Sequence, residues 1–199
     1  MKYFASLPKL ITTDARGNSK LFTNIIARSS IIPSLFTNPL TFYPYDIQEN
    51  DTPEIIAHKY YNDVDRFWLV MFANQMLDPQ WDWPMNYSVF NEYLNLKYEP
   101  GQLTDPHDYQ KIIRKTDSVS GTVTIEKINV DLDTYNDLIE TTNTYTLPSG
   151  AKVSVVITKT IVDNYTYELN LNESKRNIKI LNKVYAEQIE KEFERLMSL

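Results

Sequence analysis

The sequence contains no cysteine, and only 4 of its 199 residues are glycine. Without cysteine, the chain has no disulfide bonds, thiolate metal ligands or thiol nucleophiles. So few glycines leave little material for a loop that wraps a phosphate, and the patterns GxxxxGK[ST], GxGxxG and GxSxG are all absent. These absences argue against the common nucleotide-dependent and serine- or cysteine-dependent enzymes.

The sequence also lacks an excess of basic residues and a long apolar run. Its formal net charge is -6, whereas a protein that holds a nucleic-acid backbone needs clustered Lys and Arg. No run approaches the roughly 18 apolar residues of a membrane span, and no signal peptide is visible at the start. We therefore expect a soluble intracellular product without nucleic-acid or membrane partners.

Aromatic side chains are abundant by contrast, with 14 Tyr, 8 Phe and 3 Trp. Tyr and Trp bring a large apolar area with a polar tip and are enriched where two protein surfaces meet. The hydrophobic fraction of 42% is that of an ordinary globular protein, so the chain can also form a core. The composition thus favours one domain or two small ones, with surfaces suited to protein partners.

Residues 1–42 are predicted to form an extended arm. Pro8, Pro33 and Pro39 interrupt an otherwise apolar segment, which prevents one long helix. The segment is too apolar for a disordered linker. Such an arm either lies over a partner surface or packs on its own domain, and the residues leave both possibilities open.

Residues 43–86 predict two consecutive helices. Thr52 is placed to cap the first helix with Pro53 at its first position, and Ile56 and Tyr60 lie on one apolar face. The second helix is predicted over residues 64–72 from its apolar spacing. Two helices of this length cannot bury their faces alone. We expect extended segments at 42–47 and 81–85 to cover them.

The remainder of the chain predicts a polar connection and then strands. Residues 87–119 are expected to connect the halves, with a helix at about 86–96. From residue 120 the pattern changes to a period of two, which predicts strands at 122–125, 142–147, 152–158 and 165–171 and a hairpin turn at 148–150. A terminal amphipathic helix from about Asn182 is expected to direct Glu190 to solvent. The fold class is therefore α+β, with a β-rich C-terminal domain over 120–199.

Few residues are candidates for catalysis or metal binding. His58 and His107 lie in different segments, and neither belongs to a metal or catalytic motif. One acidic group begins like a calcium loop, but Asn136 stands where that loop needs glycine, so a helix cap or a solvated loop is expected. Its members are Asp131, Asp133, Asp137 and Glu140. We predict no catalytic residue, metal ligand or cofactor.

One pair of carboxylates leaves an enzymatic alternative. Asp78 and Asp82 lie beside Trp81 and Trp83. Paired carboxylates cleave glycosidic bonds, and aromatic rings stack on sugars, so a cell-wall hydrolase stays open as an alternative.

The segment from Asn50 to Pro79 resembles the LysM pattern. Asn50-Asp51-Thr52-Pro53 opens it, and the matching residues are Asp51, Thr52, Ile56, Ala57, Tyr60, Asn74, Asp78 and Pro79. The resemblance implies a βααβ unit over 43–86. Many LysM units bind N-acetylglucosamine polymers, so a peptidoglycan-binding protein is the alternative function. Asn50 and Pro53 replace the usual Gly and Leu in the first sugar-binding loop.

The whole sequence resembles the small baseplate wedge subunit of large contractile-tailed (myovirus) bacteriophages. The similarity extends from the arm through FYPYDIQENDTPEIIAHKYYNDVDRFWLVMFANQMLDPQWDWPM to the tail YELNLNESKRNIKIL. It implies a virion protein, assembled in the host cytoplasm, without enzymatic activity or cofactor. Such a subunit docks onto other wedge subunits and helps to join neighbouring wedges into a ring around the central hub.

The same resemblance implies that the LysM-like unit docks proteins and leaves its sugar site unused. A few buried aromatic anchors usually dominate the energy of such interfaces. The candidate interface anchors are Trp68, Trp81, Trp83 and Tyr87.

Overall fold

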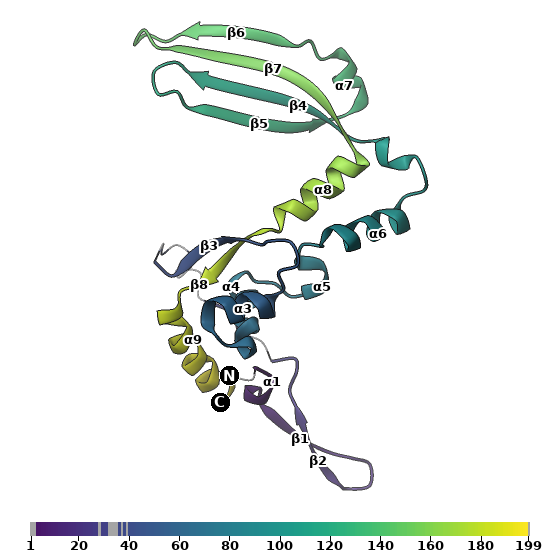
Figure 1. Cartoon of the computed structure of the whole chain (residues 1–199), viewed down its shortest axis with the longest axis vertical. Helices are drawn as coiled ribbons and strands as arrows, with labels where there is room; N and C mark the ends of the chain where they lie inside the picture. The colour runs from purple at the N-terminus through teal and green to yellow at the C-terminus, as the bar shows by residue number, and fades with distance from the viewer. Residues whose placement is uncertain (1–2, 28, 32–35, 37, 39, 199) are drawn as a thin grey trace. The chain divides into compact units, whose positions relative to one another are not determined.

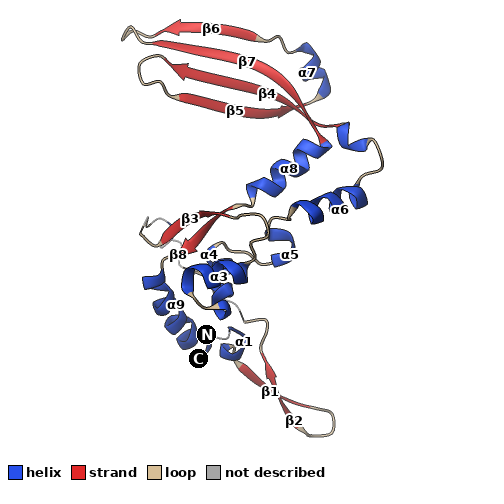
Figure 2. Ribbon diagram, viewed as in Figure 1, coloured by secondary structure: helices blue, strands red, loops and turns tan. Residues whose placement is uncertain are grey.

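The computed structural model describes residues 3–27, 29–31, 36, 38 and 40–198, which form helices and antiparallel sheets. The predicted α+β class is confirmed. The chain divides into two compact units. Unit 1 comprises residues 1–87 and 173–199, and unit 2 comprises residues 88–172 (Figures 1 and 2).

Residues 3–23 form a helical turn and a β-hairpin, within the segment that we expected to be an extended arm. The elements are α1 (Tyr3–Ser6), β1 (Lys9–Thr13) and β2 (Ser19–Thr23). The Asp14 carboxylate accepts hydrogen bonds from the backbone N–H groups of Arg16 and Asn18, and Gly17 supplies the positive φ of the turn. The expectation overlooked this turn signal. Pro33 and Pro39 lie outside the described residues.

Two helices and two strands build the centre of unit 1. They are β3 (Phe42–Asp46), α3 (Pro53–Tyr61), α4 (Phe67–Ala73) and β8 (Asn177–Leu181), with the 3-10 turn η1 (Val64–Arg66) before α4. β3 pairs antiparallel with β8, from Phe42 opposite Leu181 to Asp46 opposite Asn177. The order is thus β, α, α, β, but the last strand comes from near the C-terminus.

The strand predicted at 81–85 was wrong. Residues Pro79–Asp82 form the short helix α5 instead. The Asp78 carboxylate accepts the backbone N–H of Gln80, and Pro79 occupies the first position, where a missing N–H is harmless. This local capping starts a helical turn where the return strand was expected, and β8 takes that place beside β3.

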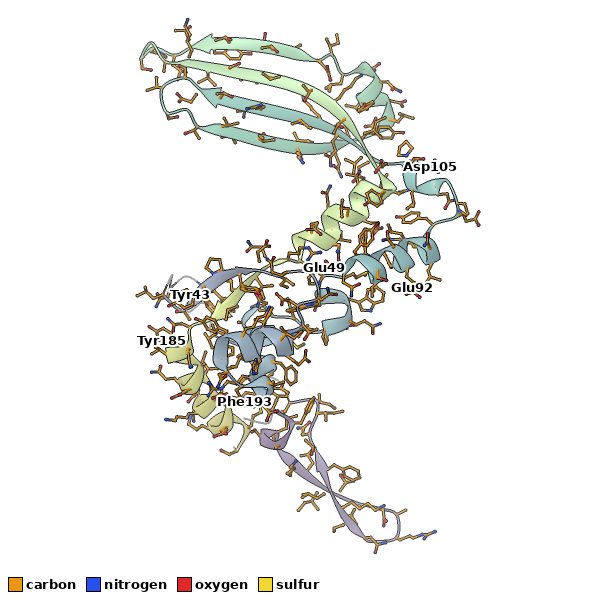
Figure 3. The ribbon with its side chains drawn as sticks, in the orientation of Figure 1. Tyr43, Glu49, Glu92, Asp105, Tyr185 and Phe193 are labelled. Atoms are coloured by element: carbon orange, nitrogen blue, oxygen red, sulfur yellow. The ribbon has the colours of Figure 1, made fainter. Side chains whose placement is uncertain are left out.

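The core of unit 1 lies between these elements and α9 (Lys183–Met197). Leu69, Leu181 and Ala186 are fully buried, and Phe193 of α9 (labelled in Figure 3) belongs to the same core cluster. Burying each large aliphatic side chain contributes about 1.5–3 kcal/mol. The Tyr61 hydroxyl donates to the Leu181 carbonyl oxygen at 2.8 Å, so the buried phenol is also paired.

The terminal helix confirms its predicted start but not its predicted orientation. Asn182 caps α9 by accepting the backbone N–H of Val184. Glu190 was expected in solvent, yet it is buried and accepts two hydrogen bonds from the Arg66 guanidinium, at 2.9 and 3.0 Å. The buried face carries Ala186, Glu190, Phe193 and Met197, whereas Val184 is exposed. The ion pair explains how a glutamate fits this face.

Unit 2 consists of a four-stranded antiparallel sheet and three helices. The sheet has the order β5-β4-β7-β6. Its strands are β4 (Pro106–Asp117), β5 (Val123–Val130), β6 (Thr141–Thr146) and β7 (Lys152–Asp163), and the other elements are α6 (Tyr87–Lys97), η2 (Gln102–Thr104), α7 (Leu132–Asp137) and α8 (Asn164–Ser174). The predicted helix at 86–96, three of the four predicted strands and the turn at 148–150 are confirmed.

Two predictions in this unit were wrong. The central strand β4 lies inside 87–119, which we expected to be a connection, because its charged residues obscured the period of two. Residues 165–171 form part of helix α8 instead of a strand. Asp163 accepts the backbone N–H of Thr166 at 2.7 Å and so caps this helix. The cap favours a helix more strongly than the alternating Tyr and Leu residues favour a strand.

The sheet of unit 2 is a single layer. In its four strands Val162 is the only buried residue among those described, while the side chains of β4 and β7 are mostly half-buried. Figure 1 shows α7 at one end of the sheet and no other helix of this unit lying across it.

Candidate docking surface

Asp51 is the centre of a hydrogen-bond network in the loop before α3. Its carboxylate accepts from the Tyr45 hydroxyl at 2.7 Å, from the Gln48 backbone N–H at 3.1 Å and from the Lys59 ammonium at 2.6 Å. Burial alone raises the pKa of Asp51, but these donors outweigh burial and hold the pKa below its ordinary value. The backbone carbonyl of Asp51 also accepts the Trp83 indole N–H at 3.0 Å. Asp51 therefore stabilises the conformation of this loop through its hydrogen bonds.

The other predicted residues of α3 have structural places. The Thr52 hydroxyl accepts the backbone N–H of Ile55 at 3.3 Å, so Thr52 caps the helix as predicted. Ile56 and Ala57 are buried in the core. Tyr60 is half-buried and lies against the Tyr43 ring, with 6.1 Å between ring centroids.

Asn74 ties the end of α4 to β8. Its amide nitrogen donates to the Lys179 carbonyl at 2.8 Å and to the Val70 carbonyl at 2.7 Å, and its oxygen accepts the Lys179 N–H at 2.8 Å. One side chain therefore pairs with both backbone groups of Lys179, as a neighbouring strand would. The contact explains why an asparagine is suited to this position.

Asp78 and Asp82 both stabilise the turn around α5 by accepting backbone N–H groups. Asp82 accepts the backbone N–H groups of Leu77 and Asp78 at 2.9 and 3.0 Å. These two hydrogen bonds lower the pKa of Asp82. Both carboxylates thus accept backbone N–H groups of the turn, as helix caps do, and this arrangement gives the hydrolase alternative no support.

The four candidate anchors lie in different environments. Trp68 is 4% exposed and packs in the core between the rings of Tyr3, Phe72 and Phe193, so its own chain covers it. Trp83 is half-buried beneath the Asp51 loop. Trp81 and Tyr87 are 53% and 72% exposed. An anchor role stays a prediction for the side chains of Trp81 and Tyr87, which a partner can reach.

An apolar groove of about 370 Å³ lies beside Trp68 in unit 1. It is lined by aromatic and aliphatic side chains of the N-terminal segment and of α4, together with the predicted motif residue Pro79. Phe4, Ile25 and Leu77 at this groove are 64%, 74% and 76% exposed. Exposed apolar side chains grouped around a groove are typical of a surface that packs against another protein.

Neither histidine occupies a metal site, and no group of three metal-ligating side chains occurs within the described part of the chain. The His107 ring stacks on Tyr167 at 3.6 Å, and the His58 side chain is exposed. In the acidic group, Asp131 accepts the backbone N–H of Thr134 and caps α7, so the predicted helix cap is confirmed.

Sequence reasoning missed the most buried charge of unit 2. The Glu168 side chain is 2% exposed and accepts from the Lys97 ammonium at 2.6 Å, the Tyr98 hydroxyl at 2.8 Å and the Tyr93 hydroxyl at 3.1 Å. The cluster joins α6 to α8. The assumption of a strand at 165–171 hid it, because a helix was needed to direct Glu168 towards α6.

No helix in the described ranges is both long and apolar enough to cross a membrane. The apolar groove and the exposed aromatic side chains are typical of a protein that packs against other proteins. The chain belongs to the family described as Base plate wedge protein 53, whose family model matches residues 22–197. It is thus a structural protein of a bacteriophage tail baseplate, as its sequence resemblance implied. No curated protein matches the chain.

Proposed function

We propose that this chain docks onto other subunits of its baseplate wedge and helps to join neighbouring wedges into a ring around the central hub, without catalysing a reaction. The observation that carries the proposal is the apolar groove beside Trp68, with its exposed rim, in a chain of the baseplate wedge family. We further propose that the protein joins the wedge in the host cytoplasm, with neither nucleic acid nor a membrane as partner.

We propose that β3, α3, α4 and β8 form a LysM-like docking unit with an unused sugar site. The order of these elements supports it, as do the structural places of Asp51, Thr52 and Asn74. Lys59, Tyr45 and Gln48 already occupy the Asp51 carboxylate, which leaves it poorly suited to a sugar hydroxyl. This favours docking over the peptidoglycan-binding alternative.

An affinity pull-down from infected host cells tests the proposed function. The tagged full-length chain is expected to recover other tail and baseplate polypeptides in a fixed ratio, as identified by mass spectrometry. The variant Leu77→Asp, at the exposed rim of the groove, is expected to reduce this recovery, whereas Leu171→Asp, on the exposed side of α8, serves as the matched control.

Two outcomes would contradict the proposal. Recovery of wall fragments without tail proteins would favour peptidoglycan binding. In that case the purified chain should also sediment with insoluble peptidoglycan, and Thr52→Ala should weaken the sedimentation. Recovery of neither tail proteins nor wall fragments would refute both functions.

A further inference from the structure

The single-layer sheet of unit 2 lacks the second layer that a sheet usually needs. A sheet buries one face against another element, because each strand alone contributes too little apolar burial to offset its conformational entropy. Here the strands run to 12 residues, yet Val162 is their only buried residue among those described.

The register separates the side chains into two faces of different chemistry. Residues directly opposite each other on paired strands point to the same side. One side, called here the apolar face, gathers Ile113, Ile128, Tyr145, Val155, Ile157 and Ile161. The other side, called here the threonine face, gathers Thr142, Thr144, Thr158 and Thr160, and its fewer apolar side chains include Ile112, Val123, Ile125 and Val156.

Only one end of the apolar face is covered within unit 2. The Tyr135 ring of α7 lies 5.1 Å from that of Tyr109, and the Lys159 ammonium lies 4.8 Å from the Tyr135 ring and donates to the Tyr135 carbonyl. Beyond α7 the apolar face continues to Tyr145, which is 55% exposed.

One charge of the apolar face is unmatched. Lys111 on the central strand β4 lies opposite Lys159 and Ile128. Lys159 is held by α7, and Lys115 pairs with Glu126 at 4.0 Å, whereas the half-buried Lys111 has no hydrogen bond or ion pair within the described residues. An ammonium group among apolar side chains is stabilised when a partner molecule places a carboxylate beside it.

We propose that the apolar face is covered in the baseplate by the apolar surface of another wedge polypeptide, which carries a carboxylate opposite Lys111. The inference rests on the proposed docking function. Strands of 6–12 residues, spaced by ~4.8 Å, give this face an area of about 600 Å². The whole face, including the end that α7 covers, is thus somewhat smaller than the ~800 Å² per partner of a standard stable interface.

A second copy of the chain is a poorer occupant. A two-fold contact places the same patch against itself, and one centred on Lys111 and Lys159 would bring these cations against those of the other copy. Like charges meeting at an interface cost several kcal/mol, which opposes this arrangement.

Single cysteines test which face is covered, because the natural chain has none. Val155→Cys and Val156→Cys replace neighbouring half-buried valines of β7 that point to the apolar face and the threonine face. Their rates of reaction with a maleimide are measured in the free full-length chain and in assembled tails. Both are expected to react similarly in the free chain, and in tails only Val155→Cys should slow, by about tenfold or more.

Each other result overturns the inference. If Val155→Cys and Val156→Cys react at equal rates in tails, the chain is present but its apolar face is open. Absence of the chain from tails would instead refute the proposed function itself. If only Val156→Cys is protected in tails, the partner covers the threonine face and not the apolar face. Slow reaction of Val155→Cys in the free monomer would mean that the chain covers its own sheet, and slow reaction only in a purified dimer would identify a second copy.

Charge variants test the carboxylate. Lys111→Glu is expected to lower incorporation into tails by about tenfold or more in competition with the natural chain, and Lys111→Met by less. Lys127→Glu on the threonine face is the matched control and should incorporate normally. If Lys111→Glu incorporates as well as the natural chain, no carboxylate faces Lys111. Circular dichroism checks that each variant is folded.

Discussion

At the scale of single residues, Glu168 carries the clearest expected effect. Its buried carboxylate accepts three hydrogen bonds, one of them from an ammonium. Glu168→Gln removes the charge that pairs with Lys97 and should lower the free energy of unfolding by about 2–3 kcal/mol, because the partly exposed ammonium can turn to water. Urea denaturation followed by circular dichroism measures the change.

The matched control for Glu168→Gln is Glu192→Gln. Glu192 pairs with Arg195 on the exposed side of α9, and an exposed pair contributes little. An equal loss in both variants would mean that burial of Glu168 adds nothing to stability.

The same residue predicts a pH dependence. Burial alone raises the pKa of Glu168, but Lys97 and the two tyrosines outweigh it and lower the pKa below its ordinary value. A carboxylate with a lowered folded-state pKa stabilises the fold above its unfolded pKa, near 4.3, and the stabilisation is lost as the pH falls towards the folded pKa. Unfolding free energies of the natural chain and Glu168→Gln should therefore converge below about pH 4. A constant difference down to pH 2 would contradict this.

At the scale of elements, Asn74 connects two that are far apart in sequence. Its side chain makes both hydrogen bonds to the backbone of Lys179 in β8. Asn74→Ala should cost about 2–3 kcal/mol and should accelerate hydrogen exchange of the Lys179 amide before that of other β8 amides. Gln188→Ala, exposed on α9, is the control. Unchanged exchange at Lys179 would show that β8 depends on β3 alone.

Elements with local signals were predictable from the sequence. Thr52 with Pro53 fixes the start of α3, and Asn182 fixes the start of α9, because caps act within a few residues. The strand at 165–171 failed because its alternation of Tyr and Leu also fits a helix that Asp163 caps. The prediction of the strand that pairs with β3 was wrong because no local sequence signal connects Phe42 with Leu181.

In the candidate site, too, local features were predictable from the sequence and long-range contacts were not. The capping role of Thr52 followed from its neighbours, whereas the anchor role of the exposed Trp81 and Tyr87 stays a prediction. The burial of Trp68 depends on Tyr3 and Phe193, from opposite ends of the chain, so only the tertiary structure reveals it.

At the scale of the whole molecule, the N-terminal hairpin tests whether the first segment meets a partner. Leu7 and Ile31 are buried in unit 1, whereas the residues of β1 and β2 are exposed except for the half-buried Thr23. Trypsin should cleave after Arg16 in the free chain and much more slowly in assembled tails. Cleavage after Arg16 at the same rate in both states would show that the hairpin has no docking role.

The pairing of β3 with β8 has a consequence for how the protein is made. Unit 1 begins at the N-terminus, yet its sheet is complete only when residues 177–181 have left the ribosome. During translation the edge of β3 stays unpaired until β8 has been made. Unit 2 lies between these two strands in the sequence and can fold first. A compact unit 2 then makes it easier to bring β8 to β3. Residues 177–181 therefore complete a sheet begun by residues 42–46, so a product terminated before residue 177 exposes its core and is open to proteolysis before it can enter a wedge.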